Sequence, residues 1–424
     1  MPPLIHSTNL MATSVLLLRP LLLAVALSLF ISSAVCSPGD SIIHHSQSYD
    51  GGLCLNLIEP WGYSCVEHTT QTNDGFMLGL QRVSSGIVNL GVEKAPPVLL
   101  LHGLFMGGDA WFLDSPNQSL GFILADRGFE VWVGNVRGTK WSHGHASLSD
   151  GDKEFWDWSW QEMALYDLET MLTYISSKTN SKVFVVGHSQ GTIMSLAAFT
   201  QPDIVNMVEA AALLSPISYL DHITSKFVLN LVNMHLEEAL SLLGIHQLNL
   251  KSDILTNILE MACDGGRVDC SDMLASITGE NCCFNSSRVD FYLEYEPHPS
   301  SLKNLKHLFQ MIRKGTFAKY DYGTLKNVLQ YGQFKPPTFD LSQIPESLPI
   351  WMAYGGNDAL GDVIDVQHTL KELRSKPNVL FLEDYGHVDF LLSTRAYDDL
   401  YDSMITFFRS CGNGISSSSS RDTN

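Results

Sequence analysis

The chain has 424 residues, of which 45% are hydrophobic, and a formal net charge of −19 at pH 7. This length and hydrophobic content are sufficient for a large buried core. The excess of acidic residues argues against nucleic acid and anionic membranes as partners, because both are bound through basic surfaces.

The N-terminus has the pattern of a signal peptide. Arg19 precedes an apolar stretch from Leu21 to Ile31, and small residues follow around Ser32 to Ser37. This stretch is shorter than the about 20 residues that a membrane span needs. We predict a signal peptide over residues 1–36, cleaved near Cys36, with an uncleaved anchor as the alternative. The mature chain would then have no transmembrane segment, and it would be secreted to the extracellular space or reach a vacuolar or lysosome-like lumen.

Eight cysteines fit an oxidising compartment. Cys54 and Cys65 are a reasonable local pair, and loss of Cys36 with the signal would leave at least one cysteine unpaired, for which Cys411 is the first candidate. Four cysteines cluster in the second half of the chain and can form one or two bridges with each other. They are Cys263, Cys270, Cys282 and Cys283. We expect no bridge between the adjacent Cys282 and Cys283. Metal binding is the alternative for the cluster, but its spacings match no zinc pattern.

The first elements of the mature chain are a hairpin and a buried strand. Asn73-Asp74-Gly75 separates strand-like runs at Tyr63 to Thr72 and Phe76 to Val83, which predicts a β-hairpin. The run Pro97 to Leu101 is apolar throughout, which is typical of a strand buried on both faces. An amphipathic helix is predicted over Met163 to Ile175. Strand patterns that alternate with helical patterns predict a mostly parallel sheet with helices on both faces.

Residues 187–191 read Gly-His-Ser-Gln-Gly and follow the apolar strand pattern of residues 183–186. A helical pattern begins directly after them. Strand, sharp turn and helix form the context in which G-x-S-x-G acts as a nucleophile elbow. Gly187 and Gly191 leave room for such a turn, because Cβ atoms there would collide across it. The pattern therefore predicts Ser189 as a nucleophile above the sheet edge.

An acid and a base follow Ser189 in the order that an α/β-hydrolase requires. Asp358 and His387 each come directly after a buried-strand pattern. Since parallel strands present their carboxyl ends at one edge of a sheet, we expect all three residues to meet there. His387 would accept the proton of Ser189, and Asp358 would orient the imidazole. Asp362 is the competing acid, but its position fits the start of the following helix.

The oxyanion hole needs two backbone donors. The strand over residues 97–101 ends in His102-Gly103-Leu104, and we predict that the N–H of Leu104 pairs with the N–H of Gln190. The alternative is that His102-Gly103 is only a turn.

Residues 216–345 separate two parts of the predicted core and are too long for a loop. Apolar residues recur there at helical spacing, as at Ile223, Phe227 and Leu231, which predicts a helical cap. The tail is serine-rich and is predicted to be disordered. The expected organisation is a signal peptide (1–36), a first core part (37–215), a cap or lid (216–345), a second core part (346–411) and the tail (412–424).

Several motifs together resemble the acid lipase family, whose animal members include gastric and lysosomal acid lipases. The amino-acid sequence of the motifs is most similar to that of the plant triacylglycerol lipases of this family. The motifs lie at residues 102–104, 134–138, 155–168, 187–191, 319–322, 355–358 and 386–390. The resemblance implies an α/β-hydrolase fold with an inserted helical cap. It also implies Ser189, Asp358 and His387 as the triad, with Leu104 and Gln190 as oxyanion donors.

The residues and the resemblance together predict a secretory-pathway lipase that hydrolyses carboxylic esters of neutral lipids, triacylglycerols above all, through an acyl-enzyme on Ser189. We expect no cofactor and no metal, and contact with a lipid–water interface through the cap. Asn117 and Asn285 begin glycosylation sequons, which have meaning in that compartment. The alternatives are a sterol-ester hydrolase, a general carboxylesterase, a thioesterase or acyltransferase, and a non-catalytic lipid-binding α/β-hydrolase.

Overall fold

The computed structural model describes residues 51–85, 95–252 and 273–412. The predicted signal peptide, the cleavage position near Cys36, the pair Cys263 and Cys270, and the predicted tail beyond residue 412 lie outside these residues. Across the three described ranges, no helix combines the length and the apolar character needed to cross a membrane.

A nine-stranded sheet forms the centre of the molecule, in the order β1-β2-β4-β3-β6-β7-β10-β11, with β5 paired to β2. The pairs that involve β2 are antiparallel, and all other pairs are parallel. The strands are β1 (Ser64–Gln71), β2 (Phe76–Ser84), β3 (Pro97–Leu101), β4 (Glu130–Gly134), β5 (Gly144–His145), β6 (Val183–His188), β7 (Val208–Leu214), β10 (Ile350–Gly355) and β11 (Asn378–Leu382).

The predicted N-terminal hairpin is confirmed. β1 and β2 pair with Gln71 opposite Met77, and the turn between them contains Gly75 at φ +100°, a value that favours glycine. The predicted local disulfide is also confirmed, because Cys54 in the helical turn η1 (Cys54–Ile58) is bonded to Cys65 in β1, with Cα atoms 5.3 Å apart. This bridge connects the first described helical turn to the edge of the sheet.

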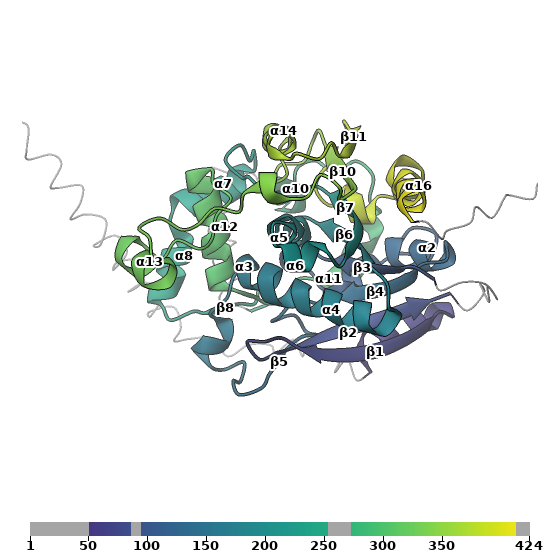
Figure 1. The fold of residues 1–424 in the computed structure, drawn as a ribbon, viewed down its shortest axis with the longest axis horizontal. Helices are drawn as coiled ribbons and strands as arrows, with labels where there is room; N and C mark the ends of the chain where they lie inside the picture. Colours follow the sequence, from purple (N-terminus) through teal and green to yellow (C-terminus); the bar gives the residue numbers. More distant parts are fainter. Residues whose placement is uncertain (1–50, 86–94, 253–272, 413–424) are drawn as a thin grey trace, which may run out of the picture. The chain divides into compact units, whose positions relative to one another are not determined.

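Helices cover both faces of the sheet (Figure 1), which explains why β3 and β6 are buried along their whole length. The fold is therefore the predicted one, a mostly parallel sheet between helical layers. The core helices are α2 (Leu120–Asp126), α3 (Trp160–Glu162), α4 (Leu168–Thr179), α5 (Gln190–Phe199), α6 (Pro202–Val205), α14 (Val363–Glu372), α15 (Asp389–Leu392) and α16 (Asp402–Cys411). Shorter 3-10 or π-helical segments are η2 (Glu59–Trp61), η3 (Gly108–Trp111), η4 (Lys153–Trp156), η5 (Met163–Asp167) and η8 (Tyr397–Tyr401).

The helix predicted over residues 163–175 is present and is longer than the periodicity indicated. It begins at α3 because Ser159 and Glu162 form a capping box, in which each side chain binds the backbone N–H of the other residue. It continues through η5 and α4 and ends where Asn180 adopts a left-handed conformation at φ +50°. The hydrophobic pattern located the buried face, whereas the caps set the ends.

The chain between β7 and β10 is largely helical in its described part. Figure 1 shows α7, α8, α12 and α13 gathered at one end of the molecule, beside α5. We refer to this part as the cap. Its elements are α7 (Lys226–Asn233), α8 (Leu236–Leu242), β8 (Gln247–Leu248), α10 (Met273–Thr278), η6 (Ser286–Arg288), α11 (Val289–Tyr295), β9 (Ser300–Ser301), α12 (Leu302–Lys314), α13 (Thr324–Tyr331) and η7 (Leu341–Gln343).

Candidate active site

Ser189 occupies a sharp turn between β6 and α5. Its backbone has φ +53° and ψ −120°, a conformation that residues other than glycine rarely adopt. A Cβ atom at Gly187 would lie 2.8 Å from the carbonyl oxygen of Gly191, and one at Gly191 would collide with the carbonyl oxygen of Leu101. Both glycines are therefore required where the strand, the turn and the helix approach each other.

The structure brings the three predicted catalytic residues together. The Oγ of Ser189 lies 2.7 Å from Nε2 of His387, and Nδ1 of His387 lies 3.0 Å from each carboxylate oxygen of Asp358. All three side chains are buried. Since the carboxylate accepts a hydrogen bond from Nδ1–H, Nε2 has a lone pair directed at the serine hydroxyl. The competing acid, Asp362, instead caps α14 by accepting a hydrogen bond from the N–H of Ile364.

Asp358 is held as a carboxylate by its neighbours. Burial would raise its pKa, but the imidazole of His387, the hydroxyl of Ser215 and the backbone N–H of Gly361 outweigh this effect and keep the pKa below its usual range. The N–H groups of Leu360 and Gly361 donate to its Oδ1 at 2.9 and 2.7 Å. A buried carboxylate with this many donors is oriented as well as charged.

Ser215 is a member of the site that the sequence analysis did not identify. It follows β7 directly, and its Oγ lies 2.5 Å from Oδ2 of Asp358 and 2.9 Å from Nδ1 of His387. Its backbone also has a positive φ of +50°, and its side chain is fully buried. A serine at the carboxyl end of a central parallel strand was the available signal, because the acid and the base were located by the same rule.

The predicted oxyanion donors are Leu104, in the loop after β3, and Gln190, the first residue of α5. We call residues 102–107, which follow β3, the oxyanion loop. A Cβ atom at Gly103 would lie 3.1 Å from the Cβ of Ser189, so this loop passes close to Ser189. The side chain of Gln190 accepts a hydrogen bond at 2.8 Å from Asn304 of α12, so the cap holds the first residue of α5. Leu104 and Gln190 both line the cavity above Ser189.

That cavity has a volume of about 320 Å³, and Ser189 and His387 form part of its wall. Its size is at the lower end of the range of about 300–1,000 Å³ that is common for ligand pockets. The cap contributes most of the apolar wall through α7, α8 and α12. Representative lining residues are Phe227, Leu231, Leu240, Leu305, Leu308 and Phe309.

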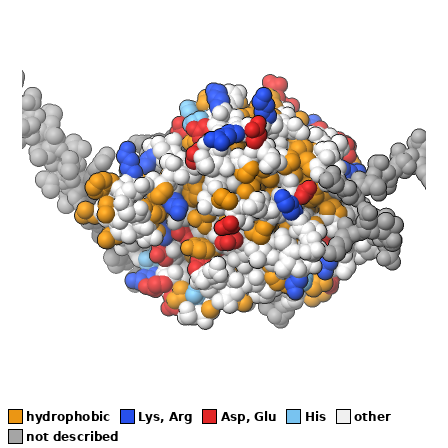
Figure 2. Space-filling view, viewed as in Figure 1, with side chains coloured by type: hydrophobic (Ala, Val, Ile, Leu, Met, Phe, Trp, Pro, Cys, Tyr) orange, Lys and Arg blue, Asp and Glu red, His pale blue; other side chains and the backbone are white. Residues whose placement is uncertain are grey.

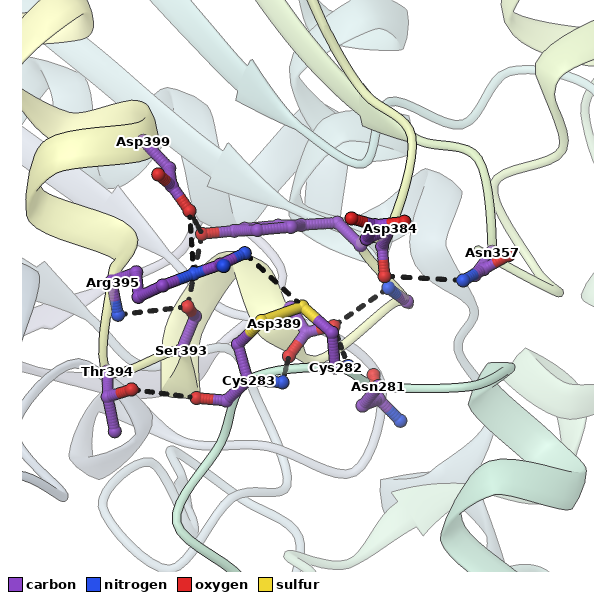
Figure 3. Close-up of a disulfide and its surroundings, with 12 residues drawn as sticks. Asn281, Cys282, Cys283, Asn357, Asp384, Asp389, Ser393, Thr394, Arg395 and Asp399 are labelled. Carbon is purple, nitrogen blue, oxygen red and sulfur yellow. Dashed lines mark hydrogen bonds and ion pairs between the residues drawn. A yellow bond between two sulfur atoms is a disulfide. The ribbon is translucent and has the colours of Figure 1, made fainter.

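The prediction that Cys282 and Cys283 would not bridge each other is wrong. They form a disulfide with Cα atoms 3.7 Å apart (Figure 3). Adjacent side chains normally point away from each other, but here the backbone turns around the carboxylate of Asp389. The N–H of Cys282 donates to Oδ2 at 2.9 Å, and the N–H of Cys283 donates to Oδ1 at 3.1 Å. The spacing of the cysteines could not predict this turn, because the carboxylate that holds it lies far away in the sequence.

Among the described cysteines, Cys411 has a free thiol, as predicted.

The same cap segment holds the loop of His387. Asp389 accepts a third hydrogen bond from the N–H of Gly386 at 2.8 Å, and Asn281 accepts one from the N–H of Val388 at 3.1 Å. The N–H of His387 itself donates to the carbonyl oxygen of Thr278 at 3.1 Å. Cap residues 278–283 therefore fix the backbone on both sides of the imidazole.

Two family models match the chain. Residues 96–394 match a model described as the alpha/beta hydrolase fold, and residues 54–115 match one described as a partial alpha/beta-hydrolase lipase region. The first match covers well over half of the chain. The chain therefore belongs to the α/β-hydrolase family, in agreement with the sheet and the elbow described above.

Within this family, the relatives of the chain are lipases. The chain is 60% identical over 389 residues to Triacylglycerol lipase 1 of Arabidopsis thaliana, with 92% of this chain and 97% of the relative covered. It is 34% identical over 361 residues to gastric triacylglycerol lipase of Rattus norvegicus, covering 82% and 90%. The chain thus belongs to the lipase family of these plant and gastric enzymes, as its motifs predicted, and it is a hydrolase.

A solved structure is similar in fold alone. The soluble variant of monoglyceride lipase from Saccharomyces cerevisiae superposes with a TM-score of 0.52 at 14% identity, covering 81% of this chain and 94% of that chain.

The close approach at the elbow gives a stability prediction. Gly191→Ala should lower the free energy of unfolding by about 1–3 kcal/mol, because the new methyl group must displace the backbone of β3 from α5. The measurement is urea denaturation followed by circular dichroism. Gly151→Ala is the matched control, since a Cβ atom there meets only the Oγ of Ser149 at 3.8 Å. Equal stability of the two variants would contradict the proposed packing.

Proposed function

We propose that the chain hydrolyses carboxylic ester bonds of neutral lipids, and of triacylglycerols in particular, through an acyl-enzyme on Ser189. The observation that carries this proposal is the hydrogen-bonded series Ser189, His387 and Asp358 at the wall of an apolar cavity. The names of the plant and gastric relatives support the substrate class. The cavity supplies the apolar surface that a fatty acyl chain requires.

In the proposed reaction, Nε2 of His387 accepts the hydroxyl proton as Oγ of Ser189 attacks the ester carbonyl carbon. The carbonyl oxygen becomes an oxyanion and accepts hydrogen bonds from the N–H groups of Leu104 and Gln190. Collapse of this intermediate breaks the bond to the alcohol, whose oxygen takes the proton from His387. Water then repeats the attack on the acyl-enzyme, which releases the fatty acid and restores Ser189. Each step uses groups of this chain and water, without a cofactor.

Ser215 is a positioning residue in this proposal. Its hydroxyl donates to Asp358 and also lies 2.9 Å from Nδ1 of His387, so it favours the carboxylate and fixes the orientation that Asp358 imposes on His387. It has no contact with the reacting bond, and it acts through Asp358.

The outer face of α13 is the proposed contact with the lipid surface. Leu325 and Leu329 lie one turn apart and are 81% and 88% exposed, and Phe334 beyond the helix is 70% exposed. Figure 2 shows hydrophobic side chains gathered at the left edge of this view, over α13. Exposed apolar surface of this kind marks an interaction site, and a lipid–water interface would bury it.

We propose that the protein matures in the secretory pathway and acts outside the cell or in a vacuolar or lysosome-like lumen. The Cys54–Cys65 disulfide supports an oxidising route. Asn117 and Asn285, which begin the two sequons, are both exposed and therefore accessible to glycosylation.

The decisive experiment compares the wild-type protein with Ser189→Ala on an emulsified long-chain triacylglycerol, a cholesteryl ester and a short-chain nitrophenyl ester. We expect triacylglycerol hydrolysis by the wild type and a loss of about 10⁴-fold or more in the variant, because the nucleophile is removed. Faster turnover of the cholesteryl ester would favour a sterol-ester hydrolase. Activity on the short ester alone would indicate a carboxylesterase, and no turnover by folded protein would indicate lipid binding without catalysis.

Ser215→Ala should lower kcat on a soluble ester about five-fold with little change in KM, since a lost hydrogen bond contributes about 1 kcal/mol. Without this donor the pKa of Asp358 rises, so the acid limb of the kcat profile should move to higher pH. Ser218→Ala is the control, because its hydroxyl is equally buried but bonds Thr369 instead. An unchanged kcat and acid limb would contradict the positioning role.

The double variant Leu325→Asp and Leu329→Asp should reduce hydrolysis of emulsified triacylglycerol roughly ten-fold or more, because burial of one leucine contributes about 1.5–3 kcal/mol. Hydrolysis of a soluble short-chain ester should not change, since neither side chain lines the cavity. Leu55→Asp, on an exposed leucine outside the cap, is the control. Equal losses on both substrates would rule out a role in interface contact.

A further inference from the structure

A second buried group of titratable side chains lies behind the oxyanion loop. It consists of Asp109 of η3 together with Glu296 and His298 of the cap segment between α11 and β9. Asp109 and His298 are fully buried, and the side chain of Glu296 is 14% exposed. One side-chain N or O atom from each residue lies within 4.8 Å of the other two. Neither the triad nor the substrate cavity includes these side chains.

This cluster holds the oxyanion loop to the cap. The N–H of His298 donates to the carbonyl oxygen of Phe105 at 2.7 Å, and the N–H of Gly107 donates to Oε1 of Glu296 at 3.1 Å. A Cβ atom at Gly107 would lie 2.6 Å from the ring of His298, so the imidazole packs directly on the loop. The loop that presents Leu104 is therefore fastened on its far side by residues 296–298.

The hydrogen bonds determine which ring nitrogen of His298 carries the proton. The backbone N–H of Lys140 donates to Nδ1 at 3.1 Å, so Nδ1 presents its lone pair there. Nε2 then carries the proton and donates it to Asp109, at 2.9 and 3.1 Å from the two carboxylate oxygens. This tautomer offers no lone pair to a metal ion at Nε2, so the cluster fits a proton-bearing group better than a metal centre.

Asp109 is the ionised carboxyl group of the cluster. Burial would raise its pKa, but the neighbouring ring of His298 and the hydrogen bond that it donates keep the pKa below its usual range. The indole N–H of Trp141 also donates to it at 3.2 Å. Asp109 is thus a buried negative charge whose donors come from two separate segments.

The pKa of Glu296 is shifted in the opposite direction to that of Asp109. Burial and the negative charge of Asp109 raise its pKa well above the usual range, and the N–H of Gly107 offsets only part of this effect. Its Oε2 is buried and has no hydrogen-bond partner among the described residues. The ammonium groups of Lys140 and Lys251 also face the cluster, and the positive charge of Lys140 lowers the pKa of Glu296 in part. Each of the two ammonium groups donates a hydrogen bond to a backbone carbonyl group, that of Tyr295 and that of Glu294 respectively. Two adjacent buried carboxyl groups cannot both ionise without strong repulsion.

We propose that the proton on Glu296 makes the anchoring of the oxyanion loop depend on pH: the loop is held to the cap in acid and loosens as Glu296 ionises beside Asp109. The consequence for catalysis rests on the proposed role of Leu104 in the oxyanion hole. A group whose pKa is raised on folding stabilises the fold below its unfolded pKa, and this contribution is lost as the pH rises through the folded pKa. Glu296 would therefore set an alkaline limit.

Glu296→Gln tests the proposal, because the amide keeps an oxygen for the N–H of Gly107 and can donate its NH₂ to Asp109 without ionising. The melting temperature and kcat on a soluble short-chain ester are measured between pH 4 and 9. In the wild type the melting temperature should fall as the pH rises, and kcat should fall along its alkaline limb. In Glu296→Gln both falls should move to higher pH by at least about one pH unit. Glu294→Gln, an exposed residue two positions earlier, should keep the wild-type profile.

Amide hydrogen exchange of the wild-type protein provides a second test that needs no variant to fold. After correction for the chemical exchange rate, protection of residues 104–108 should fall with rising pH, whereas protection of β6 should not. Identical melting profiles for the wild type and Glu296→Gln, or a loop whose protection does not change with pH, would overturn the proposal. Neither melting nor exchange requires turnover, so a failure of Ser189-dependent hydrolysis would refute the proposed function and leave this inference standing.

Discussion

The strained turn at Ser189 is the constraint on which the rest of the site depends. A serine at φ +53° persists only where its surroundings hold it, and here β6, α5 and β3 approach so closely that positions 187 and 191 must be glycine. The turn directs Oγ to the edge where β7, β10 and β11 also end. Ser215, Asp358 and His387 follow those three strands, so one sheet edge collects four side chains from distant parts of the sequence.

The cap covers the site and also holds several of its segments in place. It holds the elbow through Asn304 and Gln190, the histidine loop through Thr278, and the oxyanion loop through His298. Each of these contacts fixes backbone or side chains next to a residue of the proposed active site. Movement of the cap would therefore alter the arrangement of these residues together with access to the cavity.

Local patterns were sufficient to locate the elements and to predict that Ser189, Asp358 and His387 would lie together. The apolar runs located the strands, and the residues directly after them located Asp358 and His387, because parallel strands end at a common edge. The same rule applied to Ser215 would have found it, but serine is too common after strands to stand out. Cys282 and Cys283 were misjudged because their turn is held by Asp389, more than a hundred positions later in the chain.

The sequence by itself determined the fold class, the hairpin and the elbow, since each depends on neighbours along the chain and on strand order. It also predicted that Ser189, Asp358 and His387 would meet, as they do in the structure. Only the tertiary structure decided how the cap engages the core. The hydrogen bond of Ser215 to Asp358 and the pairing of Glu296 with Asp109 join segments far apart in sequence. The bridge of Cys282 to Cys283 forms in a turn that the distant Asp389 holds. Burial and the charge of a neighbour set the protonation of such groups, and both exist only once the chain has folded.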